Sequence, residues 1–408
     1  ANDIDTSIQA VAYLLEHDTH RNWDFYRGAA KNFLWSKLDQ EYKDEINGIV
    51  EGLHAQKKNY DSLDITAYNA MEELAYYYVP MLDDLNKPGS GDNKAPGNCS
   101  AFIATGSYTK DGKIVIGHNN WTSYITGQHW NVIADIVPQK GNHMLMDCMP
   151  GFIHSGDDFV ISSNGILVTE TTITQFKGFD STGIPEFMRA RKASQYANNI
   201  DDVVKIFATG NNGGYANDWL IGDTKTNEVA KLELGLKNYR LWRSKDTAIA
   251  GSNFASDPAL IAQETTFDIN DKTSSPNGRK VRMEQLLLVE MKGKLDAESG
   301  KKVEADHYDV AQNKNAANKC VVCGHVDEDA RGCMEWDWPT YYPGGAVQGK
   351  VTTAELAKNM QLWAHMGHPC GENFIGQKFY LAHPEYAWQK KYLVNMLSYP
   401  WTLFSAKK

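Results

Sequence analysis

Cys99 is the residue best placed to act as a nucleophile. It follows segment 86–98, which is polar and rich in Gly and Pro, as linkers are. A thiol that opens a strand directly after a linker can become a new N-terminus if the chain is cut before it. Its α-amine, with a reference pKa of about 8, would then serve as general base for the thiol. The alternative interpretation is an ordinary buried strand cysteine.

A second strand is predicted to lie beside Cys99. The dipeptide Asp111-Gly112 separates two apolar runs, and this pattern favours a hairpin in which both turn residues take positive φ. Such a hairpin places His118 and Trp121, at the far end of its second strand, next to the cysteine. Each could belong to the site. His118 could equally be a structural histidine, and Trp121 a core residue.

The closing residues of this hairpin, His-Asn-Asn-Trp at 118–121, resemble the start of the mature catalytic chain in phospholipase B-like proteins. With the penicillin acyltransferase-type peptidases, these belong to the N-terminal nucleophile (Ntn) hydrolases. The resemblance covers most of residues 99–408, whereas residues 1–98 match only as a helical N-terminal part. It implies that Cys99 is the nucleophile, that His118 is catalytic and that Trp121 contacts the substrate.

A threonine-rich segment carries the resemblance further. Residues 162–172 resemble the family strand Ser-Ser-Gly…Glu-Thr-Thr, from which a threonine approaches the nucleophile. Successive side chains of a strand point to opposite faces, so only one of Thr171 and Thr172 can point at Cys99. We expect Thr171 to do so and assign Thr172 to substrate binding. A strand rich in threonine is otherwise common.

Asn217 is the predicted oxyanion donor. Residues 211–219 resemble the family loop whose asparagine, in a Tyr-x-Asn-x-Trp setting, lines the oxyanion hole. One such donor is worth about 2.7–4 kcal/mol. The alternative is a Gly-Asn turn without chemistry.

In the family that this chain resembles, an arginine that orients the site usually follows near the start of the next long helix. Arg279 is preferred over Arg282 for this role, although most arginines at helix starts are merely solvated.

The chain also departs from the family pattern at one position. Asn98 precedes the nucleophile, where Gly or Ser is expected. Because Cys99 is expected to become the new N-terminus, the predicted cleavage site is the bond between Asn98 and Cys99. Segments 367–371 and 383–402 resemble the closing segments of bacterial members, which supports membership without indicating chemistry.

Composition excludes some classes of function. Net charge is −10 over 408 residues, which argues against a nucleic-acid partner, since binding one needs a basic face. No apolar run is long enough to span a bilayer. The chain opens at Ala1 without a methionine, which fits a mature exported protein or a trimmed chain. An exported protein would be periplasmic or extracellular, or lysosome-like in a eukaryote.

Four of the six cysteines gather in the C-terminal part: Cys320, Cys323, Cys333 and Cys370. We expect a Cys320–Cys323 disulfide, and a second one between Cys333 and Cys370. Free thiols and a zinc site that adds His325 are the alternatives. A zinc site built on this Cys-x-x-Cys would normally need a second close pair.

Periodicity predicts helices before the linker and mostly strands after it. The predicted helices lie within 1–85 and at 185–197, 200–209, 278–292, 352–366 and 384–397. The predicted strands are 100–109, 114–121, 129–137, 143–149, 158–163, 165–174, 218–223, 228–234, 238–244 and 247–254. The fold class is therefore α+β. Specifically, we expect the αββα sandwich of an Ntn hydrolase, with two antiparallel sheets between helix layers.

The predicted organisation is a helical segment 1–85, a processing linker 86–98 and a catalytic domain 99–408. The predicted function is hydrolysis of an amide or ester acyl bond through an acyl-thioester at Cys99, after self-cleavage at that residue. The substrate would be a small-molecule or lipid-like acyl compound, with no cofactor and no metal. The alternatives are acyl transfer through the same thioester, a non-catalytic binding protein on the same fold, and a structural or metal protein centred on Cys320 and Cys323.

Overall fold

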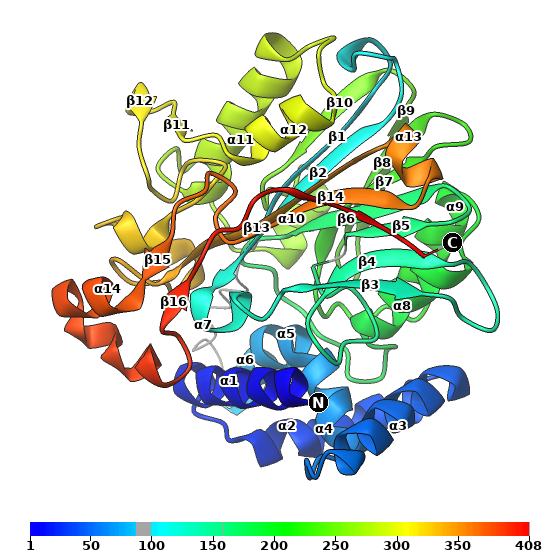
Figure 1. Ribbon diagram of the computed structural model, residues 1–408, viewed down its shortest axis with the longest axis vertical. Coiled ribbons are helices and arrows are strands. Elements are labelled where there is room, and N and C mark those ends of the chain that lie inside the picture. The colour runs from blue at the N-terminus through cyan, green and yellow to red at the C-terminus, as the bar shows by residue number, and fades with distance from the viewer. Residues whose placement is uncertain (87–98, 158, 408) are drawn as a thin grey trace.

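The computed structural model describes residues 1–86, 99–157 and 159–407. In this part of the chain, two large antiparallel sheets stack face to face, and helices cover their outer faces (Figure 1). This layering confirms the predicted αββα sandwich. Most of the predicted linker and the predicted cleavage-site residue Asn98 lie outside the described residues.

The first sheet contains the strand that Cys99 precedes. Its described strands follow the order β10-β1-β2-β13-β14-β17. Their bounds are β10 (Thr247–Gly251), β1 (Ser100–Thr105), β2 (Val115–Ser123), β13 (Gly344–Thr353), β14 (Gln361–Met366) and β17 (Thr402–Ser405). Strands β1 and β2 are thus central, which places the residue before β1 inside the molecule.

The second sheet is a meander in which strands adjacent in sequence are adjacent in space. Its described strands follow the order β3-β4-β5-β6-β7-β8-β9. Their bounds are β3 (Val132–Ile136), β4 (Met144–Cys148), β5 (Val160–Ser162), β6 (Ile166–Thr172), β7 (Asn217–Asp223), β8 (Glu228–Leu234) and β9 (Tyr239–Ser244). Asn217, predicted to lie in a loop, is the first residue of β7.

The predicted pairing of the first two strands is confirmed, but their connection differs from the prediction. Ala101 pairs with His118 in an antiparallel register. Strand β1 ends at Thr105, and a 3-10 turn, η4 (Gly106–Tyr108), follows. Of the two predicted turn residues only Gly112 has positive φ, at 74°. The two-residue turn is therefore wrong. Ser107 bonds to Asp246 instead, through its backbone N–H and its hydroxyl at 2.7 Å each.

Three layers of apolar side chains hold the sandwich together. Between the sheets, Ile103 and Ile116 of the first sheet pack with Leu167 and Leu220 of the second. The outer face of the second sheet is covered by α8 (Glu186–Tyr196) and α9 (Ile200–Ala208). The outer face of the first is covered by α11 (Ser275–Gln285), the π-helical η5 (Leu286–Glu290) and α12 (Ala297–Glu304).

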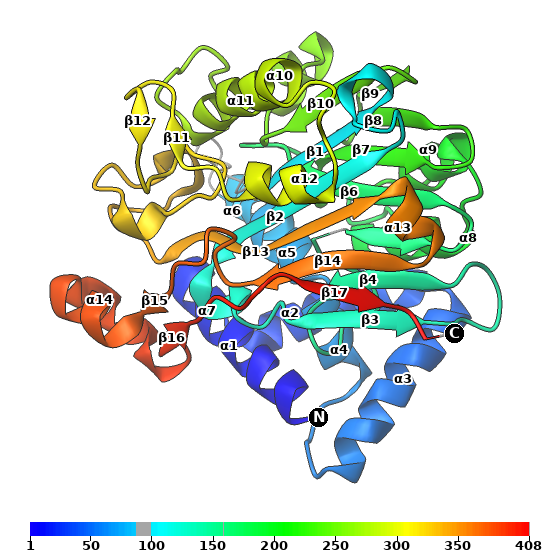
Figure 2. The ribbon, with the colours of Figure 1, turned by 45° about the horizontal axis from the view of Figure 1, so that its top comes forward.

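The N-terminal helices pack together at one end of the sandwich (Figure 2). Their bounds are α1 (Asn2–Thr19), α2 (Trp23–Ala29), η1 (Ala30–Leu34), η2 (Trp35–Lys37), α3 (Gln40–Ala55), α4 (Ser62–Asn69), α5 (Met71–Glu73), η3 (Leu74–Tyr78) and α6 (Val79–Asn86). They share one apolar core with the sandwich, in which the rings of Tyr68 and Phe152 lie 4.8 Å apart. In the described residues, no helix is long and apolar enough to cross a membrane.

Two predicted C-terminal helices are wrong. Region 352–366 contains the end of β13, the short helix α13 (Ala354–Lys358) and β14. Region 384–397 is a 3-10 helix, η8 (Pro384–Lys391), followed by β16 (Asn395–Met396). Pairing of β14 with β13 and β17 overrides the local helical pattern.

Several short elements complete the described chain. These are α7 (Tyr124–Gly127), α10 (Pro258–Glu264), β11 (Tyr308–Asp309), β12 (Lys314–Asn315), η6 (Val326–Glu328), η7 (Met334–Trp336), β15 (Phe374–Ile375) and α14 (Gly376–Ala382). Strands β11 and β12 pair with each other, as do β15 and β16.

Candidate active site

Cys99 lies directly before β1, fully buried. Its φ of 94° falls in a region that residues other than glycine rarely adopt, at a cost of about 1–3 kcal/mol. The thiol donates to Glu170 Oε1 at 3.5 Å, and Asn120 Oδ1 lies 3.9 Å from Sγ. A strained backbone and a thiol that faces a carboxylate thus coincide at the predicted nucleophile.

His118 stands beside this thiol without a close hydrogen bond. One ligand atom each from Cys99, His118 and Glu170 lie within 4.8 Å of one another. The ring is 4.0 Å from Glu170 through Nε2 and 3.9 Å from Asp157 through Nδ1, too far for hydrogen bonds. Neither ring nitrogen has a hydrogen-bond partner among the described residues. Burial and the nearby Lys350 lower the pKa of His118 well below its usual value, so the ring is neutral.

A buried charge cluster lies between the sheets next to His118. Lys350 of β13 is fully buried and donates to Asp147 at 3.0 Å and to Asp157. Burial disfavours its charge, but the two carboxylates hold the pKa of Lys350 above its usual value. The cluster therefore contains a cation, which adds to burial in disfavouring protonation of His118.

The environment of the thiol opposes ionisation in the intact chain. Burial, and then the charge of Glu170, raise the pKa of the Cys99 thiol well above its usual value. The thiolate is the reactive form of cysteine. To act as a nucleophile, the thiol would have to lose its proton to a neighbouring base.

Arg279 holds the backbone of Cys99. This fully buried arginine of α11 donates to the carbonyl oxygen of Cys99, to Ser100 Oγ at 3.0 Å and to Asn253 Oδ1 at 2.7 Å. Burial lowers the pKa of the guanidinium to about 10, so it stays charged at neutral pH. Arg282, the alternative candidate, instead pairs with Asp306 at 2.7 Å.

Trp121 lies behind this arginine. The guanidinium carbon of Arg279 is 4.3 Å from the centre of the Trp121 ring, within cation–π range. The indole nitrogen donates to the carbonyl of Val322 at 3.3 Å. The indole is fully buried, and a Cβ at Gly324 would come within 1.7 Å of a ring carbon. These contacts give Trp121 the position of a support for Arg279.

The two candidate threonines have different neighbours. Thr171 packs against Gly251, where a Cβ would meet its side chain at 2.9 Å, and Gly251 pairs with Ala101 close to Cys99. The Thr172 hydroxyl donates to Tyr215 at 3.0 Å. The Tyr215 hydroxyl in turn donates to Glu170 at 3.3 Å. Thr172 thus belongs to the hydrogen-bond chain that reaches the carboxylate facing the thiol.

Asn217 pairs with Thr172 across β6 and β7 and is fully buried. Neither its amide nitrogen nor its amide oxygen has a hydrogen-bond partner among the described residues. Buried amides are normally satisfied, so an unpaired one calls for an explanation such as a catalytic role. This is the state expected of a donor that waits for an oxyanion.

Two cavities lie near these residues. A groove of about 480 Å³ runs between the N-terminal helices and the aromatic residues Trp336, Trp338 and Tyr342. Trp336 connects it to the site, because the guanidinium of Arg279 lies 5.4 Å from the centre of its ring. A smaller enclosed cavity is lined by Tyr215 together with residues of α4 and α5.

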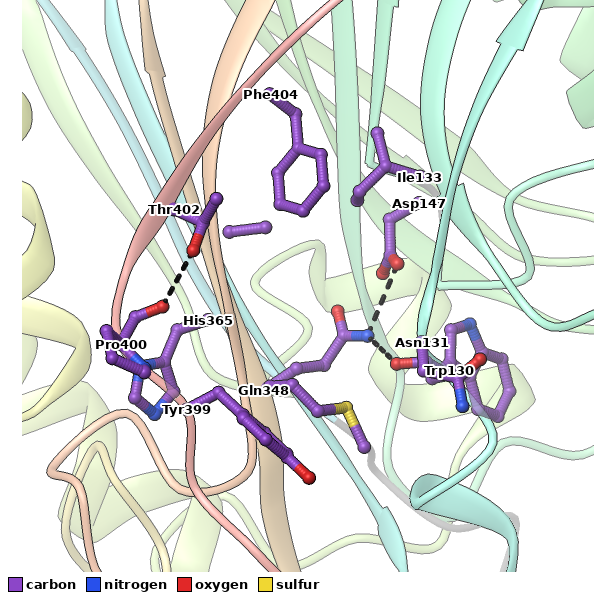
Figure 3. Close-up of a pocket in the computed structure, with 12 residues that line it drawn as sticks. Trp130, Asn131, Ile133, Asp147, Gln348, His365, Tyr399, Pro400, Thr402 and Phe404 are labelled. Atoms are coloured by element: carbon purple, nitrogen blue, oxygen red, sulfur yellow. Dashed lines mark hydrogen bonds between the residues drawn. The ribbon is translucent and has the colours of Figure 1, made fainter.

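A third cavity, of about 120 Å³, lies between β3, β4, β13, β14 and β17 (Figure 3). Gln348 spans one side of it, where its amide donates to the Trp130 carbonyl at 2.6 Å and to Asp147 at 3.3 Å. Asp147 also belongs to the buried charge cluster, so this cavity borders that cluster.

Sequence reasoning missed three charged residues of the site. Glu170 faces the thiol, whereas Asp157 and Lys350 form a buried ion pair beside His118. Glu170 belongs to the segment that carried the family resemblance, but it was given no role. A carboxylate or an ammonium inside a strand of apolar and β-branched residues is the signal that could have found Glu170 and Lys350.

The predicted disulfides are not formed. All six cysteines lie in the described residues and all are free. The Sγ of Cys320 points to the Thr273 carbonyl at 3.7 Å, whereas the Sγ of Cys323 lies 3.7 Å from His325. The two sulfurs thus have different neighbours. Cys370 is also next to His325, at 3.6 Å, and not paired with Cys333.

Comparison with known proteins identifies relatives of this chain. The sequence model of the Phospholipase B family matches residues 4–277, more than half of the chain. Phospholipase B-like 2 of Bos taurus is 32% identical over 157 residues, covering 35% of this chain and 26% of the relative. Phospholipase B-like protein G of Dictyostelium discoideum is 40% identical over 141 residues, covering 31% of this chain and 23% of the relative. The matches thus span about a quarter of these relatives.

Solved structures give only distant likenesses. A mutant conjugated bile acid hydrolase from Clostridium perfringens aligns with a TM-score of 0.40 and 9% identity, over 65% of this chain and 89% of that one. Penicillin V acylase from Agrobacterium tumefaciens aligns with a TM-score of 0.31 and 8% identity, over 66% and 83%. The family assignment rests on the sequence match alone. On that match, the chain belongs to the phospholipase B family.

Proposed function

We propose that this chain is an N-terminal-nucleophile cysteine hydrolase that cleaves an amide or ester acyl bond through a thioester at Cys99. The observation that carries the proposal is what surrounds this one residue. Arg279 holds its carbonyl, Glu170 accepts from its thiol, and its own φ is strained. An ordinary buried cysteine needs none of these.

Maturation would begin with an N-to-S acyl shift. The Sγ of Cys99 attacks the carbonyl carbon of Asn98 and passes its proton towards Glu170. A carbon–sulfur bond forms, the carbon–nitrogen bond breaks, and the released α-amine takes up a proton. Water then hydrolyses the thioester and leaves Cys99 as a free N-terminus. The strained φ of 94° supports this step, since the cut relieves the strain.

Turnover would use the new α-amine as general base, because its reference pKa of about 8 suits that task. The amine takes the thiol proton, the thiolate attacks the acyl carbonyl, and the leaving amine or alcohol receives the proton. Asn217, whose buried amide is unpaired, would donate to the oxyanion. Water finally hydrolyses the thioester. Arg279 keeps the carbonyl of Cys99 in place throughout.

The substrate we propose is an N-acyl amide, a peptide-like amide or a lipid acyl ester. The groove beside Trp336 and Trp338 supports an apolar acyl chain, since aromatic walls favour apolar ligands. The proposed chemistry uses only side chains and the α-amine, without an organic cofactor. Membership of the phospholipase B family is consistent with an acyl ester.

Export from the cell is part of the same proposal, and fractionation of expressing cells tests it.

Intact mass spectrometry of the purified chain tests the proposal. We expect fragments 1–98 and 99–408 from wild type and from Cys148→Ala, a control at another buried cysteine, but a single chain from Cys99→Ala. Acylated substrates should then add their acyl mass to Cys99 of the larger fragment. A cut that persists in Cys99→Ala, or acyl hydrolysis by an intact chain, would contradict the mechanism. Added amine acceptors show whether acyl transfer competes with hydrolysis.

A further inference from the structure

Four side chains from three separate segments point their ligand atoms at one spot. They are His307, Cys323, His325 and Cys370, whose ligand atoms all lie within 4.8 Å of one another. Cys323 and His325 are buried, and the other two are half-buried. The segments that contribute His307 and Cys370 lead into β11 and β15, which lie on the same side of the molecule (Figure 2).

The separations from His325 Nε2 to the other three ligand atoms match the edges of a metal tetrahedron. The Nε2 atoms of His307 and His325 are 3.1 Å apart, and His325 Nε2 lies 3.7 Å from Cys323 Sγ and 3.6 Å from Cys370 Sγ. Zinc bonds of about 2.0–2.1 Å to nitrogen and about 2.3 Å to sulfur give tetrahedral edges of about 3.3 Å between nitrogens and about 3.5 Å between nitrogen and sulfur. The three separations from His325 Nε2 fit these edges, and all four atoms lie within 4.8 Å of one another, close enough to share one ion.

Hydrogen bonds alone cannot account for the arrangement. The Nε2 atom of His325 has three polar neighbours, namely His307 Nε2 and the sulfurs of Cys323 and Cys370. An imidazole nitrogen carries either one proton or one lone pair, so it can satisfy only one of them. A cation at the centre would replace these competing contacts by four bonds.

We propose that these four residues form a structural zinc site. Two thiolates and two imidazoles in a tetrahedron are a donor set that selects zinc among the common divalent ions. All four positions are filled by protein atoms, which distinguishes a structural zinc site from a catalytic one. The site differs from the zinc alternative weighed in the sequence, because Cys320 is not part of it.

The surroundings of the cluster fit this assignment. The Nδ1 atom of His325, on the far side of its ring, lies 4.0 Å from the carboxylate of Glu372. The backbone N–H of Glu372 donates to the sulfur of Cys370 at 3.5 Å. A hydrogen bond to a ligand sulfur is usual around metal sites. The Glu372 carboxylate lies near the far side of the His325 ring, although 4.0 Å is too long for a hydrogen bond.

The site would fix the loop that supports Trp121. Cys323 and His325 flank Gly324, which packs against the Trp121 ring. The carbonyl of Val322 accepts from the indole nitrogen of Trp121. Because Trp121 in turn stacks on Arg279, the metal would stabilise the position of the arginine that holds Cys99. The proposal rests on the cluster alone and stands whether or not the chain is a hydrolase.

Metal analysis of the full chain, purified without chelators from zinc-supplemented medium, tests the proposal. We expect about one zinc ion per chain by plasma mass spectrometry, as for a saturated structural site. Cys323→Ser and His307→Ala should each lower zinc affinity by more than about 100-fold, since even changes behind the ligands cost about 10–100-fold. Cys320→Ser is the matched control, a buried cysteine of the same Cys-x-x-Cys, and should keep its zinc.

Cobalt substitution keeps the test decisive if a variant fails to fold. Wild-type protein stripped with a chelator and titrated with Co²⁺ should show tetrahedral d–d bands together with sulfur-to-cobalt charge-transfer bands. Absence of zinc and of these bands, or zinc retained by Cys323→Ser, would overturn the proposal. So would a Cys323–Cys370 disulfide found by non-reducing peptide mapping, because a disulfide sulfur is no thiolate ligand.

Discussion

At the scale of single residues, the base for the first proton transfer is the main question that the site raises. The thiol of Cys99 is within hydrogen-bonding distance of Glu170, whereas His118 is neutral and makes no hydrogen bond to either among the described residues. A neutral imidazole does not lower the pKa of a thiol by its charge. In the uncut chain, where the α-amine of Cys99 is still an amide, Glu170 is thus the acceptor in place.

Glu170→Gln should slow self-cleavage strongly. Glutamine keeps the shape of the side chain but cannot take a proton, and general base catalysis typically contributes about 10²–10⁴-fold. The rate at which purified chain converts to fragments, followed by intact mass, is the measurement. Glu304→Gln is the control, since Glu304, like Glu170, is fully buried. Burial raises the pKa of Glu304 well above its usual value. Unchanged cleavage in Glu170→Gln would remove this carboxylate from the mechanism.

Asn217→Ala should lower the rate of acyl-enzyme formation by about 10²–10³-fold, with little change in substrate binding, because the contact strengthens only in the transition state. Folding should survive, since the amide has no partner among the described residues that the change would leave unsatisfied. Pre-steady-state acylation of processed protein is the measurement. Asn211→Ala, in the same glycine-rich segment, should acylate normally.

Asn217→Asp is the stricter comparison for the same residue. It replaces a donor by a carboxylate that repels the developing oxyanion, so it should be at least as damaging to acylation as alanine. Burial of an unpaired carboxyl should also cost stability. Acylation by either variant at the wild-type rate would exclude Asn217 from the oxyanion hole and point to Asn212 or to backbone donors.

At the scale of elements, a buried carboxyl joins the N-terminal helices to the sandwich. Glu73, the last residue of α5, accepts from Asn212 at 2.6 Å and from the backbone N–H of Glu186 at 3.3 Å. Burial raises the pKa of Glu73 from 4.5 to about 7, against the hydrogen bond from Asn212, which lowers it. The docking of α5 therefore depends on a carboxyl that keeps its proton into the neutral range.

The contribution of Glu73 to the free energy of unfolding should therefore fall as pH rises from about 4.5 to about 7. The folded chain keeps a proton on Glu73 that the unfolded chain loses above pH 4.5, so this contribution is fully present below that pH and is lost through the folded pKa of about 7. Each pKa unit corresponds to about 1.4 kcal/mol. Urea unfolding of wild type and Glu73→Gln at pH 5 to 8 measures it.

The glutamine variant should lack the part of this pH dependence that Glu73 contributes, whereas Glu72, whose pKa burial also raises to about 7, keeps its own part. Wild type should therefore lose stability relative to the variant as pH rises. Glu51→Gln, at an exposed position of α3, should follow wild type at every pH. A constant difference between Glu73→Gln and wild type would show that the carboxyl ionises alike in both states.

At the scale of the whole molecule, the helical segment and the sandwich are packed as one body. Glu45 pairs with Arg191 at 2.9 Å, and Asn69 accepts from the backbone N–H of Ile153 at 2.8 Å and donates to the Gly151 carbonyl at 3.2 Å. The helical segment and the sandwich also contribute side chains to one shared apolar core. A cut before Cys99 would break none of these contacts.

Fragments 1–98 and 99–408 should therefore stay together after cleavage. Size-exclusion chromatography of processed protein in native buffer should give one peak that contains both fragments, and urea should separate them. Arg191→Ala should weaken the association by leaving Glu45 unpaired, whereas Arg243→Ala, at an ion pair within the sandwich, should not. Spontaneous release of the smaller fragment would show that the helices are a removable cover.

Local patterns determined much of this protein from the sequence. The strand after Cys99, its pairing with the strand of His118, the helices before the linker and the αββα layering all depend on side-chain periodicity and breaker residues, which act over a few positions. The family motifs likewise led to Arg279, which the structure brings to the carbonyl of Cys99. Such features are written in consecutive residues.

Only the tertiary structure decided what faces what across the sandwich. Glu170 meets the thiol because β6 of one sheet ends beside β1 of the other, and Lys350 lies by His118 because β13 inserts next to β2. Strands β13 and β17 were missed for the same reason, since β13 pairs with the distant β2 and β17 with β14, about 35 residues earlier in the chain. The cluster of His307, Cys323 and Cys370 also spans three segments, and the sequence favoured the nearer cysteine pair. Contacts of this kind depend on how sheets stack, and no local spacing encodes that.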